Sequence, residues 1–283
     1  DRPDQTESAS IVPTGWLQVE AGVLQEKAEN TISYPLYGGA ISTTNTELSG
    51  YAVPGVLFRL GLSKQIELRL GITYLYEETA SLTRSGPFSL EKRSAEEHQA
   101  SSATIPDNVT PQTVEGFDAV NVGTKIRISD EDTERWIPQS AILVTFTLPG
   151  TGAVHFETDY LVPEVRFAFA HTLSDRFSLG YNLGALWDGD NERHIGYYSF
   201  VLGAGLIHDI SCFAEVYGDL PGDTSPLHRF NAGITWLIKN DLQVDLSYGV
   251  GLTEPANSWR AIPFAYAMDS FISAGVSWRL PVW

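Results

Sequence analysis

Acidic and basic residues stand two positions apart at several places in the sequence. Side chains of opposite charge at this spacing could select charged or dipolar solutes. Glu67 and Arg69 are separated by one leucine, and Glu164 and Arg166 by one valine. Residues i and i+2 of a strand share a face of the sheet, where each can also reach an opposite charge on the neighbouring strand. Rings of such side chains choose the permeants of selective pores. The simpler interpretation is structural packing.

The elements that must position these charges are β-strands, because apolar and polar residues alternate. In 242–252 every even position is apolar, and the odd positions carry Gln, Asp, Ser and Gly. The same period of two recurs in 230–238, 272–280 and 177–187. This pattern predicts an all-β protein with one apolar and one polar face along each strand.

The connections between the predicted strands alternate in length. Segments 63–65 and 173–176 are tight turns, whereas 28–47, 81–115 and 254–268 are long. Short turns at one end and long outer loops at the other are typical of bacterial outer-membrane barrels. We therefore expect one domain over residues 1–283, a closed antiparallel transmembrane β-barrel of about twelve strands with both termini periplasmic. The predicted strands are 15–27, 48–63, 65–80, 116–129, 136–149, 160–173, 176–188, 195–208, 210–219, 228–239, 241–253 and 269–283.

If the apolar face of each strand meets lipid, a set of charged residues faces the lumen. A slip of one residue would turn these charges toward lipid, at ~2–4 kcal/mol for an Arg or Lys at the bilayer midplane. Twelve strands fall between small filled barrels and wide porins, so the charges either plug the interior or line a narrow pore. The predicted lumen residues are Glu20, Arg59, Glu67, Arg69, Lys125, Arg127, Glu164, Arg166, Glu215, Arg229, Asp245 and Arg279.

The composition excludes several other classes of function. A formal net charge of −17 argues against nucleic acid as a partner and disfavours acidic substrates overall. The single cysteine, Cys212, rules out an internal disulfide and a multi-cysteine zinc site. Acidic clusters at 188–192 and 219–223 could bind Ca²⁺, but such clusters are more often hydrated turns. We expect no cofactor and no metal. The start at Asp1 suggests a removed secretory signal.

Two alternatives to a transmembrane channel come from the same patterns. A soluble β-sandwich also alternates, but aromatic residues near strand ends, such as Trp136 and Trp187, favour interfacial girdles. A barrel lipase would need a histidine beside a serine, and only His171 joins a lipid-facing row, with Phe167 and Phe169. We therefore expect that the protein is not an enzyme.

Several segments resemble one family of outer-membrane β-barrel transporters, labelled as the MetA pathway of phenol degradation. The most distinctive is the opening Asp1-Arg-Pro-Asp-Gln-Thr-Glu-Ser8, followed by 12–22. Segments 163–166, 179–184, 213–218 and 273–279 are also similar. The resemblance covers the full length. It implies a porin-like barrel of a Gram-negative outer membrane that passes small, aromatic or hydrophobic molecules.

Residues 1–14 precede the first predicted strand and form a periplasmic leader. Asp1, Arg2, Asp4 and Glu7 are too charged for lipid, and we expect them to enter the periplasmic mouth and pair with lumen charges. A disordered leader is the alternative.

The primary interpretation is an outer-membrane channel that gives a small solute passive, selective passage through a narrow charged lumen. The alternative is a plugged structural or interaction barrel whose long outer loops bind a partner or assemble into a larger outer-membrane complex. Further expected partners are membrane lipid and the barrel assembly machinery, which would read Trp283 as its signal, although Pro281 interrupts the alternation just before it. The solute itself is not identified by the sequence.

Overall fold

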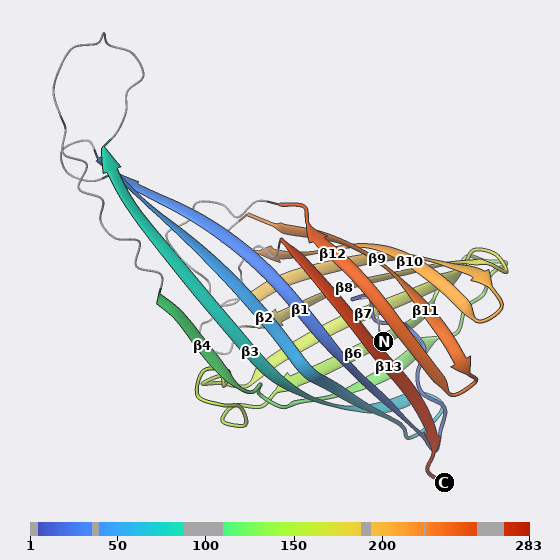
Figure 1. Cartoon of the computed structure of the whole chain (residues 1–283). Helices are drawn as coiled ribbons and strands as arrows, with labels where there is room; N and C mark the ends of the chain where they lie inside the picture. The colour runs from blue at the N-terminus through green and yellow to red at the C-terminus, as the bar shows by residue number, and fades with distance from the viewer. Residues whose placement is uncertain (1–4, 36–39, 88–109, 188–193, 223–224, 254–268) are drawn as a thin grey trace, which may run out of the picture.

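The computed structural model describes residues 5–35, 40–87, 110–187, 194–222, 225–253 and 269–283. In these residues the chain forms one antiparallel sheet that closes on itself, because β1 pairs with both β2 and β13 (Figure 1). No helix in this described part of the chain is long and apolar enough to cross a membrane. The strands are β1 (Trp16–Pro35), β2 (Ala40–Gly61), β3 (Ile66–Pro87), β4 (Thr110–Phe117), β5 (Asn121–Ser129), β6 (Gln139–Thr147), β7 (Val162–Thr172), β8 (Phe177–Trp187), β9 (His194–Ile207), β10 (Ile210–Pro221), β11 (Leu227–Lys239), β12 (Leu242–Gly251) and β13 (Ser270–Pro281).

The barrel has twelve strand positions, which confirms the predicted closed antiparallel β-barrel of about twelve strands. β4 and β5 share one position, because both pair with β3: β4 opposite 74–81 and β5 opposite 66–71. The prediction of one continuous strand over 116–129 was therefore wrong. The interruption lies at 118–120, where Ala119 is buried and the Val120 carbonyl accepts a hydrogen bond from the Leu148 amide.

β1, β2 and β3 are about twice as long as most other strands and project beyond them (Figure 1). The prediction of a loop over 28–47 was wrong, since β1 and β2 stay paired as far as Pro35 opposite Ile41. Of the expected loop 81–115, residues 81–87 extend β3 and 110–115 belong to β4. These extensions are rich in Ser, Thr and other residues that favour strands but lack the apolar alternation of a lipid-facing surface. The expected loop 254–268 lies outside the described residues.

The two faces of the sheet are inverted relative to a soluble protein. Outward side chains are large and apolar, as in the cross-strand row of Tyr181, Phe200, Val216 and Phe230. Phe200 is 48% exposed, whereas the inward Glu215 is 1% exposed. A polar interior within an apolar wall is the arrangement of a barrel that stands in lipid.

The two ends of the barrel differ in their connections. At one end the predicted tight turns are present: the Ser63 amide donates to the Ile66 carbonyl, and the Ser174 amide to the Phe177 carbonyl. β1 begins and β13 ends at this same end, where Trp16 pairs with Pro281. We call it the short-turn end and the opposite one the long-loop end.

Candidate functional site

The candidate site is the barrel interior, where every one of the twelve predicted lumen residues lies on the inward face of its strand. The register shows this directly: Arg59 is opposite Arg69, Glu67 opposite Lys125, and Gln18 opposite Arg279. Glu20, Arg59, Glu67, Lys125, Glu215 and Asp245 are buried. Whether they face open space depends on what else fills the interior.

Arg59 is the centre of a buried ion-pair network on β1, β2 and β3. Its Nε and Nη2 atoms donate to the two carboxylate oxygens of Glu67, at 2.7 and 2.9 Å, and its Nη1 reaches Glu20 at 2.8 Å. Gln18 also donates to Glu20 and accepts from Arg279. The alternation of each strand places these side chains inward, and the antiparallel register brings the three strands' charges to one height.

The leader crosses this interior from one wall to the other in the part from Gln5 to Val12. Near β9 and β10, the Gln5 amide donates to Glu215 at 2.9 Å, and the Thr6 hydroxyl donates to Ser199 at 2.8 Å. At the far wall the Val12 amide donates to Glu67 at 2.8 Å. The two ends of this part of the leader are therefore held by hydrogen bonds to opposite sides of the barrel.

The middle of the leader is held through both its main chain and its small side chains. The Glu7 main-chain amide donates to the side-chain Oδ1 of Asn182 at 2.6 Å, and the side-chain Nδ2 of Asn182 donates back to the Glu7 main-chain carbonyl at 2.9 Å. Ala9 is fully buried against Ala141, Leu143 and Ala168 of β6 and β7. A residue larger than alanine would not fit at position 9 without displacing this wall.

The carboxylate of Glu7 sits in a cluster of cations. Arg69 contacts both of its oxygens, and the Lys125 ammonium lies 3.0 Å away. Burial raises the pKa of Glu7, but the charges of Arg69, Lys125 and Arg166 lower it more strongly, so that the pKa lies well below its usual range. Glu7 is therefore ionised at neutral pH and acts as a counter-ion of these cations.

Arg166 closes the cluster from β7. Its guanidinium donates to Glu164 at 2.9 Å, to the Tyr197 hydroxyl at 3.0 Å and to the Gln5 carbonyl at 3.1 Å. It also lies 4.7 Å from the centre of the Tyr197 ring, in a cation–π contact. These partners fix the guanidinium in one orientation beside the leader.

Two of the predicted lumen charges form ion pairs apart from this cluster. Arg229 pairs with Asp219 at 2.6 Å and lies over the Tyr217 ring. Arg127 pairs with Asp130 near the short-turn end. These two arginines therefore do not contribute to the group around the leader.

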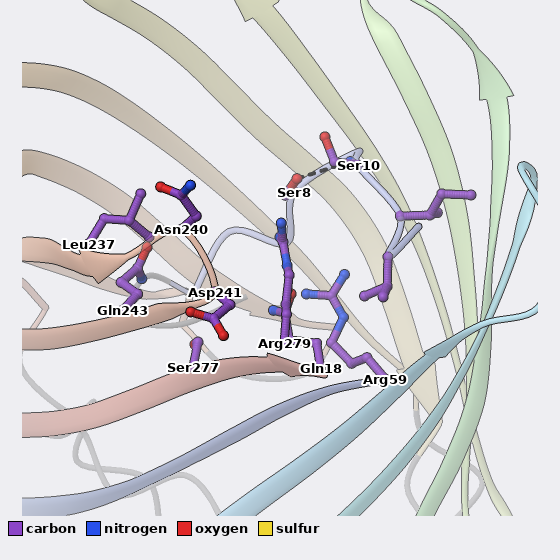
Figure 2. A pocket seen from close by; sticks show the side chains of 12 residues that line it. Ser8, Ser10, Gln18, Arg59, Leu237, Asn240, Asp241, Gln243, Ser277 and Arg279 are labelled. Atoms are coloured by element: carbon purple, nitrogen blue, oxygen red, sulfur yellow. Dashed lines mark hydrogen bonds between the residues drawn. The ribbon is translucent and has the colours of Figure 1, made fainter. Parts of the chain in front are cut away.

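Two cavities lie on either side of the leader and its ion pairs. One, of about 400 Å³, opens at the short-turn end and is lined by Ser8, Ser10, Arg59, Asp241 and Arg279, among others (Figure 2). The other, of about 220 Å³, lies toward the long-loop end; most of its lining side chains are polar or charged, among them Glu7, Arg69, Glu164 and Arg166, and the apolar ones are Leu57 and Leu143. Figure 2 shows Arg59 and Arg279 side by side, below the leader residues Ser8 and Ser10.

Sequence reasoning missed the neutral residues that hold the leader. Asn182, Ser199 and Tyr197 follow the same inward alternation as the predicted charges, and that alternation was the available signal. Only charged residues were selected, so these three were overlooked.

The other predicted sites lie elsewhere or are not described. Asp1, Arg2 and Asp4 are outside the described residues, as is the whole acidic cluster 188–192. His171 faces outward with its ring stacked on Tyr181. Within the described ranges, no group of three potential metal ligands comes together. The Trp283 side chain is 69% exposed.

Comparisons with known proteins agree with this architecture. An outer membrane channel from Pseudomonas putida F1 superimposes with a TM-score of 0.60 at 10% identity, covering 99% of this chain and 100% of that chain. The toluene transporter TbuX from Ralstonia pickettii gives a TM-score of 0.46 at 7% identity, over 96% of this chain and 90% of that chain. None of the curated proteins compared matches in sequence. Residues 1–261 match a family model, and the chain belongs to the family described as "Putative MetA-pathway of phenol degradation".

Proposed function

We propose that the protein is an outer-membrane channel of a Gram-negative bacterium that gives a small solute passive, selective passage, and that the leader is its removable stopper. The observation that carries this proposal is the interior itself. The leader lies between the two cavities, and hydrogen bonds and ion pairs hold it to the barrel wall. Polar contacts of this kind can be exchanged for contacts with water, whereas a packed apolar core cannot.

The charged inner wall supports selectivity. Arg59, Arg279 and Asp241 line the cavity at the short-turn end, and Arg69, Arg166 and Glu164 line the one toward the long-loop end. A solute that crosses must pass both signs of charge at short distance, which favours polar or dipolar groups of defined geometry. The family description makes an aromatic compound the first solute to test.

The orientation follows from the ends of the barrel. Short turns face the periplasm in barrels of this kind, so the short-turn end, with both termini, is proposed to be periplasmic. The solute would then enter at the long-loop end and leave past the leader. Outward apolar residues would contact membrane lipid, and Trp283 would be read by the assembly machinery.

A second candidate function is an interaction barrel, and the long strands β1–β3 favour it. They project beyond the rest of the barrel (Figure 1), where a surface partner or a larger outer-membrane complex could add to them. Shortening the hairpin of β1 and β2 would abolish recovery of the partner from native membranes while leaving conductance unchanged. The channel proposal predicts that solute passage survives this shortening.

Solute uptake tests the channel directly. The folded protein is placed in liposomes, and swelling is followed with a set of small solutes, including phenol-sized aromatic compounds and sugars. The proposal predicts faster swelling with some of the small solutes than protein-free liposomes show, and none with solutes too large for a narrow lumen. A folded barrel that gives no swelling with any solute, and no ionic current in a planar bilayer, would support the interaction barrel instead.

A further inference from the structure

The cation cluster around Glu7 is built like a receptor for a carboxylate. Arg69 contacts both carboxylate oxygens with two nitrogens of its guanidinium, the geometry in which arginine recognises carboxylates. Lys125 adds a charge at 3.0 Å, and its side chain is fully buried. In the structure this receptor is filled by a residue of the same chain.

The charge balance among the described residues favours an anion at this place. Around Glu7, the four cations Arg59, Arg69, Lys125 and Arg166 outnumber the other described carboxylates of the ion pairs, Glu20, Glu67 and Glu164, by one. A buried cation without a partner is strongly destabilising. The overall negative charge of the chain disfavours anions at a distance, but at this site the local excess is positive. If Glu7 moves away, another anion is favoured in its place.

Two leucines give the space next to the carboxylate one apolar side, where a small apolar group can lie. The cavity of about 220 Å³ lies against Glu7, Arg69 and Arg166, and its wall includes Leu57 and Leu143. This volume is below the ~300–1,000 Å³ of sites that hold drug-sized ligands, which restricts the occupant to about one ring or a short chain. A ligand with a carboxylate at one end and an apolar body at the other would fill both parts.

We propose that Arg69, Lys125 and Arg166 form a binding site for the carboxylate of a small solute with an apolar body, and that Glu7 occupies this site as a built-in competitor. An arene carboxylate such as benzoate has the required shape and charge. Its binding and the docking of Glu7 exclude each other, because both need the same nitrogens of Arg69. Binding of the solute therefore displaces the Glu7 side chain and removes one of the contacts that hold the middle of the leader. The inference rests on the proposed channel function in one respect, that the solute reaches the site through the barrel.

A titration of the detergent-folded full chain with benzoate tests the site. A tethered carboxylate competes at an effective concentration in the millimolar range, so the wild-type protein should bind benzoate weakly. Glu7→Ala removes the competitor and should lower the Kd for benzoate by about tenfold or more. Glu134→Ala is the matched control, because it removes one exposed acidic residue in the turn between β5 and β6 and should leave the Kd at the wild-type value.

Two further probes distinguish a carboxylate-binding site from a non-specific cavity created by the Glu7→Ala substitution. Benzyl alcohol has a similar body without the charge, and its weak binding should not change in Glu7→Ala. Acetate has the charge without the body and should bind more weakly than benzoate. If Glu7→Ala lowered the Kd values for benzyl alcohol and for benzoate equally, the proposal would be overturned. An unchanged benzoate Kd would also overturn it, provided that heat-dependent gel mobility shows the variant to be folded.

The cations are tested in the background that lacks the competitor. Adding Arg69→Met to Glu7→Ala should return the benzoate Kd to the wild-type value or above it, and adding Arg166→Met gives a second, independent variant on another strand. If benzoate still binds tightly in both folded double variants, the assigned site is wrong.

Failure of this inference is distinguishable from failure of the channel proposal. Current through the same preparations in potassium chloride reports on the channel without any carboxylate. A conducting barrel whose benzoate affinity does not depend on Glu7 contradicts the carboxylate site alone. A silent barrel in which Glu7→Ala tightens benzoate binding supports the site and contradicts the channel.

Discussion

Arg59 holds Glu67 through two parallel hydrogen bonds of 2.7 and 2.9 Å, and with its third nitrogen it reaches Glu20 at 2.8 Å. Both Arg59 and Glu67 are almost fully buried. Glu67 in turn accepts a hydrogen bond from the Val12 amide, which anchors the end of the leader. One guanidinium thus orders the barrel wall and, through Glu67, the segment that crosses the interior.

Replacing Arg59 should destabilise the barrel severely. Arg59→Met keeps much of the side-chain volume but leaves Glu20 and Glu67 without their shared cation, which we expect to lower the free energy of unfolding by about 3–5 kcal/mol. Urea titration in lipid vesicles measures this loss. Arg135→Met is the control, because the exposed Arg135 forms a long ion pair with Asp132, and its loss should cost within ~0–1 kcal/mol. Equal losses in the two variants would show that the buried network adds no stability.

Acidification should release the leader. The pKa of docked Glu7 is held below its ordinary value, so the docking energy that it provides is complete above the undocked pKa of about 4.3 and is lost as the pH falls below it. Arg69, Lys125 and Arg166 keep their charge in this acidic range. We expect the ionic conductance to rise reversibly as the pH falls below about 4.3 toward the lowered pKa of docked Glu7.

Glu7→Gln separates this effect from other acidic groups in the lumen. Its conductance should be high already at pH 7 and should lack the acid-dependent rise that is due to residue 7. If the wild-type protein and Glu7→Gln show the same pH profile, Glu7 does not control the leader.

A charged residue on the apolar outer face should lower the stability of the barrel. Phe200 points outward midway along β9, and Phe200→Arg should cost ~2–4 kcal/mol of folding free energy if that face lies in the bilayer. Tyr160→Arg, in the exposed connection between β6 and β7, should change the stability by at most about 0.5 kcal/mol. The urea midpoint in vesicles compares the two. A soluble barrel would tolerate both changes equally.

Alternation predicted much of the barrel wall because the lipid-facing and lumen-facing residues differ so strongly in polarity. The segment 241–253 was predicted from that pattern and is β12, Leu242–Gly251, in the structure. The same rule failed for 28–47, since both faces of that hairpin carry polar residues and no period of two is visible.

The pairing of the charges could not be read from the sequence. Which cation meets Glu67 depends on the register between β2 and β3, and near Glu67 that register is set by the turn at 62–65. The expectation that Glu7 pairs with lumen charges named no partner. Asn182, which holds Glu7 by its main chain, looks like any other inward polar residue in the sequence.

Single-channel conductance in potassium chloride, measured for the full chain and for a variant without residues 1–10, tests the central claim most directly. The deletion removes the contacts of Gln5, Thr6 and Glu7 with the wall. We predict discrete currents for both proteins, with a clearly larger conductance and a shift toward anion selectivity in the deletion variant, because cations that the leader had neutralised become accessible. A folded deletion variant with the conductance and selectivity of the full chain would contradict the account of the leader as a stopper.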